Sequence, residues 1–141
     1  MLRIIGGILA GIVTLFVTVF VIEWIGHQFF PISAEVNLRD PAANPTFVTD
    51  APIGAQLFVV AAWFGGALLG GLIAGRISDR HWAVWVIAGF VVVAAIANIV
   101  MIPHPVWMQI GAVVAPLIGG FIASRMVPST EWRARGRADA V

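Results

Sequence analysis

The sequence has no cysteine, which excludes disulfide bonds and thiolate ligands for a metal or a redox centre. Charged residues make up only 11% of the 141 residues, whereas about 25% is usual in soluble domains. Hydrophobic residues reach 60%, and the mean hydropathy is +0.99. A soluble domain of this length cannot bury so much apolar surface. We therefore expect the chain to be embedded in a lipid bilayer.

Lysine is also missing, since all 8 basic residues are arginines. The net charge is +1 and no run of residues forms a basic face, so nucleic acid is not expected as a partner. Arg133, Arg135 and Arg137 near the C-terminus suit the headgroups of anionic membrane lipids instead. The sequence holds no Ser-His-Asp arrangement, phosphate loop or dinucleotide fingerprint, and a non-enzymatic protein is expected.

Four apolar runs dominate the sequence, at residues 4–27, 53–76, 82–102 and 106–127. Each has about 20 residues or slightly more, which at 1.5 Å per residue matches a hydrocarbon core of roughly 30 Å. Helices satisfy their own backbone hydrogen bonds, as lipid requires. The sequence thus predicts one all-α transmembrane domain over residues 1–141, a four-helix bundle. The first run is longer than the apolar part of a secretory signal and is expected to remain as a helix.

The arginines predict the orientation of this bundle. Those in the first 127 residues gather at one end of the spans, except for Arg39: Arg3, Arg76, Arg80 and Arg125. The positive-inside rule then puts both termini and the tail of residues 128–141 in the cytoplasm. Residues 28–52 form one long outer loop, and a loop of about 25 residues is usually functional or packs as a lid. An ordered spacer without a role is the alternative.

Stripes of small residues on each run predict close helix packing, because small residues let the backbones of membrane helices approach. They are Gly7, Gly11, Thr14 and Thr18; Gly66 and Gly70; Gly71 and Gly75; Ala94 and Ala97; and Ala112, Pro116, Gly119 and Ala123, with Gly120 beside the last group. The second run has two glycine rows about 100° apart. One of these rows can face a second subunit, so self-association is plausible.

Polar residues within the spans gather towards the outer end, and such residues are functional candidates because lipid makes them costly. They are Glu23, His27, Gln56, Asn98, His104 and Gln109. Glu23 and His27 are four residues apart and share a helix face. Gln56, Asn98 and Gln109 each fall on the small-residue side of their helix. A convergent polar pocket at the outer end is the prediction.

Three uses of these residues remain open. Glu23, His27 and His104 can ligate a metal, and the two histidines can instead ligate a haem. Glu23 and His27 can also carry protons. The structural interpretation is that Glu23 and His27 form a hydrogen-bonded pair that locks the bundle. It also takes Asn98 as a link between helices and His104 as a solvated turn residue.

Two stretches carry a resemblance to known sequences: Glu23-Trp24-Ile25-Gly26-His27 followed by Pro31, and Asn98 running to Met101-Ile102-Pro103-His104-Pro105-Val106-Trp107. In these stretches the chain resembles a group of small bacterial four-span membrane proteins. The resemblance implies the four-helix fold and a setting in the bacterial inner membrane. It transfers no catalytic residue.

The sequence therefore favours a small structural or accessory subunit that assembles with itself or with a larger membrane complex, without a cofactor. The alternative is a transporter, channel, or metal- or haem-binding protein that uses the outer polar residues.

Overall fold

Four helices make up the computed structural model, which describes residues 1–31 and 46–127. They are α1 (Leu2–Phe29), α2 (Ile53–Ser78), α3 (His81–Met101) and α4 (Val106–Met126). All four are long and apolar enough to cross a membrane. The predicted fold class is confirmed, and each predicted span begins and ends within two residues of its helix.

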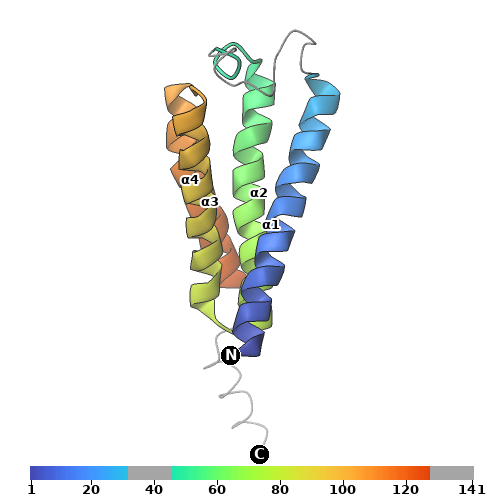
Figure 1. Ribbon diagram of the computed structural model, residues 1–141, viewed down its shortest axis with the longest axis vertical. Helices are drawn as coiled ribbons and strands as arrows, with labels where there is room; N and C mark the ends of the chain where they lie inside the picture. The colour runs from blue at the N-terminus through green and yellow to red at the C-terminus, as the bar shows by residue number, and fades with distance from the viewer. Residues whose placement is uncertain (32–45, 128–141) are drawn as a thin grey trace, which may run out of the picture.

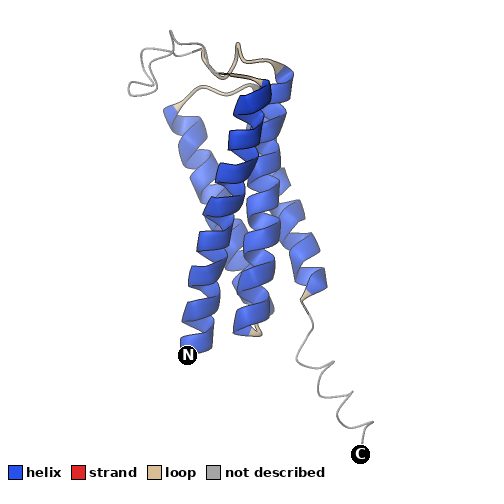
Figure 2. Ribbon diagram, turned by 90° about the vertical axis from the view of Figure 1, so that its right-hand side faces the viewer, coloured by secondary structure: helices blue, strands red, loops and turns tan. Residues whose placement is uncertain are grey.

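The helices run alternately up and down, so α1 starts and α4 ends at the same end of the molecule (Figures 1 and 2). The end that holds Leu2, Ser78, His81 and Met126 is called here the arginine end. The opposite end, with Phe29, Ile53, Met101 and Val106, is the loop end. The first helix extends through Gln28 to Phe29, so the connection from α1 to α2 is slightly shorter than predicted.

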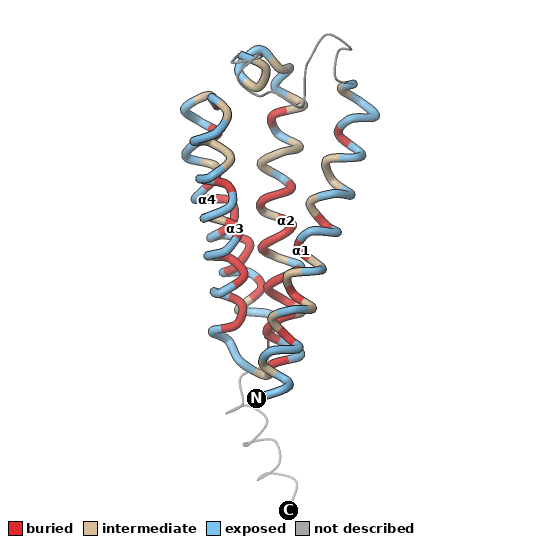
Figure 3. The backbone as a smooth tube through the Cα atoms, in the orientation of Figure 1, coloured by how far each residue is buried: buried red, intermediate tan, exposed pale blue. Residues whose placement is uncertain are grey.

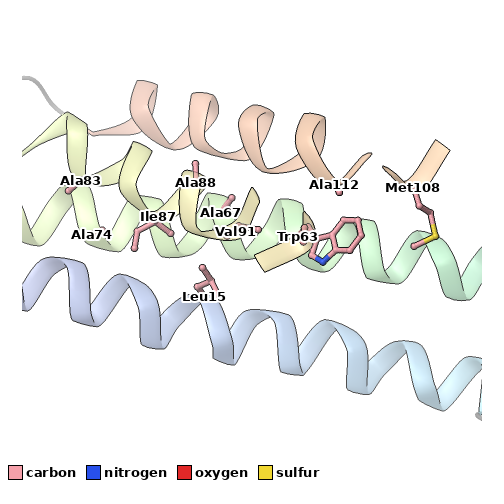
Figure 4. Close-up of a cluster of buried hydrophobic side chains, with 11 residues drawn as sticks. Leu15, Trp63, Ala67, Ala74, Ala83, Ile87, Ala88, Val91, Met108 and Ala112 are labelled. Atoms are coloured by element: carbon pink, nitrogen blue, oxygen red, sulfur yellow. The ribbon is translucent and has the colours of Figure 1, made fainter. Parts of the chain in front are cut away.

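Helix α2 lies at the centre of the bundle and packs against each of the other three helices. Figure 3 shows its buried positions running along most of its length, whereas α1 is buried along one side only. The main core cluster takes residues from all four helices, and 6 of its 11 members are alanines (Figure 4). With such short side chains, the helices pack at close range.

Helices α1 and α2 approach each other closely at Gly11 and Gly70. A Cβ atom built on Gly11 would lie 2.8 Å from the Gly70 carbonyl oxygen, and one on Gly70 would lie 2.8 Å from the Gly11 carbonyl oxygen. Gly7 meets the backbone of Ser78 in the same way, at 2.8 Å from its nitrogen. Only glycine leaves room for two backbones at this distance, so this predicted stripe is confirmed as a packing surface.

The second glycine row of α2 is covered by the same chain. A Cβ on Gly71 would meet Val84 and Ala123, and one on Gly75 would meet Val84 and Val127. Since Gly66 and Gly70 face α1, both rows are covered by the same chain, and neither is left open for the second subunit that one of them could have faced.

Helix α4 packs on α2 and α3 through the face predicted for it, since Ala112, Pro116, Gly119 and Ala123 are all buried. A Cβ on Gly119 would lie 2.6 Å from the Phe64 carbonyl oxygen, and one on Gly120 would lie 2.7 Å from the Ala88 Cβ. The helix runs unbroken through Pro116.

The predicted packed face of α3 was wrong. Ala94 and Ala97 are exposed, and the buried face carries Ala83, Val84, Ile87, Ala88, Val91 and Ala95 instead. Alanine and valine occur on both sides of this helix, so small size alone did not distinguish the packed side from the lipid side.

Candidate functional site

Gln56 forms the centre of the polar contacts at the loop end, where its side chain is only 4% exposed. It lies in the first turn of α2, close to the segment of residues 46–52 that leads into the helix. Its amide nitrogen donates to the carbonyl oxygens of Val48 at 2.9 Å and Ala51 at 3.0 Å. Its amide oxygen accepts a hydrogen bond from the indole nitrogen of Trp107 at 3.2 Å. Both ends of this amide are thus used within the chain.

His104 is buried in the turn between α3 and α4, with 6% exposure, so the expectation of a solvated residue is wrong. Its Nδ1 donates to the Ile102 carbonyl oxygen, since a carbonyl can only accept. Its ring packs against Trp63 of α2, with 6.3 Å between ring centroids. The carbonyl oxygen of His104 accepts a hydrogen bond from the Gln109 side chain at 2.9 Å.

Together these contacts join three elements at the loop end: the segment of residues 46–52, the start of α2 and the turn from α3 into α4. We call Gln56, Trp63, His104, Trp107 and Gln109 the loop-end cluster. Each polar side chain in it that forms a hydrogen bond does so with another part of the same chain. Among the described residues, no buried side-chain nitrogen or oxygen atom lacks a partner. The cluster therefore holds these three elements together.

Glu23 and His27 lie on α1, outside this cluster. Glu23 is partly buried and His27 is exposed. Within the described ranges, Arg3 and Asp79 form the ion pair that the structure shows, and neither Glu23 nor His27 takes part in a side-chain hydrogen bond. The expected hydrogen-bonded pair is therefore not formed.

Asn98 is partly buried on α3, and its side chain makes no hydrogen bond to the described residues. Its backbone carbonyl caps the helix by accepting the Ile102 amide at 2.9 Å. The predicted role as a link between helices is thus not seen, because α3 turns this residue towards the side of the exposed Ala94 and Met101.

Helical phase explains where Glu23 points. Glu23 follows Phe16 by seven residues and His27 follows it by eleven, so both lie within about 20° of its direction. Phe16 meets Phe90 of α3 edge to face, with 6.3 Å between centroids. Towards the loop end α1 leans away from α3 (Figure 1), and Phe20 on the same side is 69% exposed. We call Phe20, Glu23 and His27 the α1 stripe; α3 does not cover it.

The predicted polar residues thus separate into two groups. Gln56, His104 and Gln109 come together, whereas Glu23 and His27 lie on the α1 stripe. In the part of the chain that the structure describes, no group of three or more His, Asp or Glu side chains is arranged to hold a metal. Glu23, His27 and His104 are therefore not assembled into a three-ligand site.

Sequence reasoning did not identify Trp63 and Trp107 as members of the loop-end cluster. The bond of Trp107 to Gln56 joins residues 51 positions apart, which no local pattern reveals. Both tryptophans occur towards the same end of the predicted spans as Gln56 and His104. A tryptophan N–H group that is buried usually needs a hydrogen-bond acceptor, so this placement was the sequence signal for their membership of the cluster.

Comparisons with protein-family models, curated proteins and solved structures gave no match.

Proposed function

We propose that this chain is a small non-enzymatic membrane protein that serves as a structural or accessory subunit, and that it assembles through the α1 stripe. The observation that carries this proposal is Glu23, a carboxyl group on a membrane-crossing helix that has no hydrogen bond or ion pair within the described chain. Ionisable groups inside a bilayer normally pair with one another or with backbone carbonyls.

Glu23 lies six residues before the end of α1, or about 9 Å along the helix axis. Lipid tails provide no hydrogen-bond donor at this depth. A second membrane helix with a hydroxyl, amide or basic side chain would provide one, and the exposed ring of Phe20 would pack against it. Assembly with another chain therefore satisfies a group that the protein alone leaves unsatisfied.

The loop-end cluster supports a structural role. Its glutamines and its histidine hold the protein's own backbone, and Gln56 has no free amide group for a substrate. The glycine rows of α2 are likewise occupied by α1, α3 and α4. Among the described residues, the α1 stripe then presents polar side chains within a span that are left for a partner, as does Asn98 on α3.

The proposed setting is the bacterial inner membrane, with the arginine end in the cytoplasm. Two observations from the sequence support it: the resemblance to small bacterial four-span proteins, and the gathering of Arg3, Arg76, Arg80 and Arg125 at one end of the helices.

Site-specific photo-crosslinking tests the proposal. A photoreactive phenylalanine analogue replaces Phe20 in one variant and Val93 of α3 in another; these positions are 69% and 67% exposed. After irradiation in native membranes, we expect an adduct from position 20 and little from position 93. Its mass distinguishes a second copy, which adds 15.0 kDa, from a different subunit.

A second substitution links this adduct to Glu23. Glu23→Ala should lower the yield at position 20 several-fold, while Glu23→Gln, which keeps hydrogen-bonding capacity, should lower it less. Equal yields from positions 20 and 93, or a yield unaffected by Glu23→Ala, would refute assembly through the α1 stripe.

A further inference from the structure

Three exposed arginines at the arginine end have no acidic partner in the described chain. Arg3 pairs with Asp79 at 2.9 Å. Arg76 at the end of α2, Arg80 in the turn and Arg125 at the end of α4 are exposed, and none of them forms an ion pair within the described ranges. Within the described residues, these three positive charges are therefore available to a ligand.

Arg76 and Arg125 lie at a similar depth. The parallel helices α2 and α4 meet at Gly71 and Ala123, where a Cβ on the glycine would be 3.5 Å from that of the alanine. Counting from this level, Arg76 is five residues further along its helix and Arg125 is two. At 1.5 Å per residue the two side chains start within about one turn of each other along the axis.

Exposed aromatic rings lie at the same end of the bundle as the arginines. Trp82 and Trp85 in the first turns of α3 are 48% and 43% exposed. The Trp85 ring also reaches α4 beside Gly120, where a Cβ would lie 3.7 Å from it. The Arg125 guanidinium lies 4.9 Å from the centroid of the Phe121 ring. Tryptophan rings of this kind mark the headgroup level of a bilayer.

We infer that Arg76, Arg80 and Arg125, with Trp82 and Trp85, form a binding surface for the phosphate headgroups of anionic phospholipids. A guanidinium binds a phosphate through two parallel hydrogen bonds. Arg76 and Arg125 start at a similar depth, and Arg80 lies in the turn at the same end of the bundle, so all three border a layer of headgroups. The aromatic rings fit the glycerol and upper acyl region of the same lipids. An acidic protein partner is the competing occupant.

Lipid binding to the purified protein tests this inference. Native mass spectrometry follows titration with phosphatidylglycerol or phosphatidylcholine, which differ in headgroup charge. We expect preferential retention of phosphatidylglycerol, with a dissociation constant that rises about fivefold for each of Arg76→Gln and Arg80→Gln. The variants Arg76→Lys and Arg80→Lys keep the charge but lose the two parallel hydrogen bonds of a guanidinium. Their dissociation constants for phosphatidylglycerol should lie between those of the wild type and the glutamine variants.

Arg39→Gln provides the control, because it removes one positive charge from the connection between α1 and α2. It should leave phosphatidylglycerol binding unchanged. Inorganic phosphate at the same concentration should not displace the lipid, since the aromatic contacts need acyl and glycerol groups. Equal binding of the two lipids, or the same loss from Arg39→Gln as from Arg76→Gln, would overturn the inference. A surface that retains neither lipid would favour the acidic partner instead and would also overturn it.

Discussion

Individual glycines differ sharply in how much space surrounds them. A Cβ on Gly11 would lie 2.7 Å from the Ala74 Cβ and 2.8 Å from the Gly70 carbonyl oxygen, whereas a Cβ on Gly6 would have nothing within 4 Å. Both residues are in the same apolar run of α1. Their different environments follow from the helix face, which the spacing of Gly7, Gly11 and Thr18 predicted correctly.

Gly11→Ala should therefore destabilise the protein by about 1–3 kcal/mol, because a methyl group at this point forces the backbones of α1 and α2 apart. Gly6→Ala should change stability by no more than about 0.5 kcal/mol. Unfolding by sodium dodecyl sulfate in mixed micelles, followed by tryptophan fluorescence, measures both. Equal effects would show that α1 and α2 do not cross at Gly11.

Gln56 provides a second prediction at this scale. Gln56→Leu removes the donor to the Val48 and Ala51 carbonyls and the acceptor for Trp107, which should cost about 1–3 kcal/mol. Amide hydrogen exchange within residues 46–52 should rise. Gln28→Leu, at an exposed position that bonds only to the Trp24 carbonyl of its own helix, is the matched control. Unchanged amide hydrogen exchange of residues 46–52 in Gln56→Leu would contradict the conclusion that Gln56 holds this segment in place.

At the scale of helices, the sequence predicted the number and length of the four helices well, because both follow from the long apolar runs. It predicted the packed face of α1, α2 and α4 because glycines, or small residues beside a proline, recur there at three- or four-residue spacing. It failed for α3, where Ala94 and Ala97 are as small as the buried Ala88 and Ala95. It also failed for Asn98, whose assignment depended on the same face.

The pairing of the parallel helices α2 and α4 can be tested with cysteines, since the chain has none of its own. At Gly71 and Ala123 the Cβ atoms would be 3.5 Å apart, at the short end of the disulfide range. The double variant G71C/A123C should oxidise and become protected from maleimide. The pair G89C/A123C should stay reactive, because a Cβ on Gly89 would have no neighbour within 4 Å. Similar reactivity in both would contradict the pairing.

The arrangement of the whole molecule could be predicted only in part. Two short connections indicate that α2, α3 and α4 are antiparallel neighbours. That α1 packs almost entirely on α2 and diverges from α3 depends on long-range contacts such as Gly11 with Gly70 and Gly26 with Phe58. No local pattern encodes those contacts, so the predicted outer pocket that joined Glu23 to His104 did not form.

The orientation is a prediction for the whole chain. A green fluorescent protein fused after Val141 should fluoresce, and an alkaline phosphatase fused after Asp50 should be active, since the arginine end is expected in the cytoplasm and the loop end outside it. Fluorescence is lost when the reporter is exported unfolded, and phosphatase needs export, so the two reporters give opposite signals. A fluorescent protein that is dark at the C-terminus together with an inactive phosphatase would reverse the orientation.

The molecular mass of the protein in its native membrane tests the proposed function most directly. Extraction in a mild detergent, followed by native mass spectrometry, measures it without any substitution. We predict a complex well above the 15.0 kDa of one chain, either a multiple of that mass or the sum with a second subunit. The Glu23→Ala variant should shift this complex towards the single chain. A wild-type protein that leaves the membrane as a bare 15.0 kDa monomer would contradict the account.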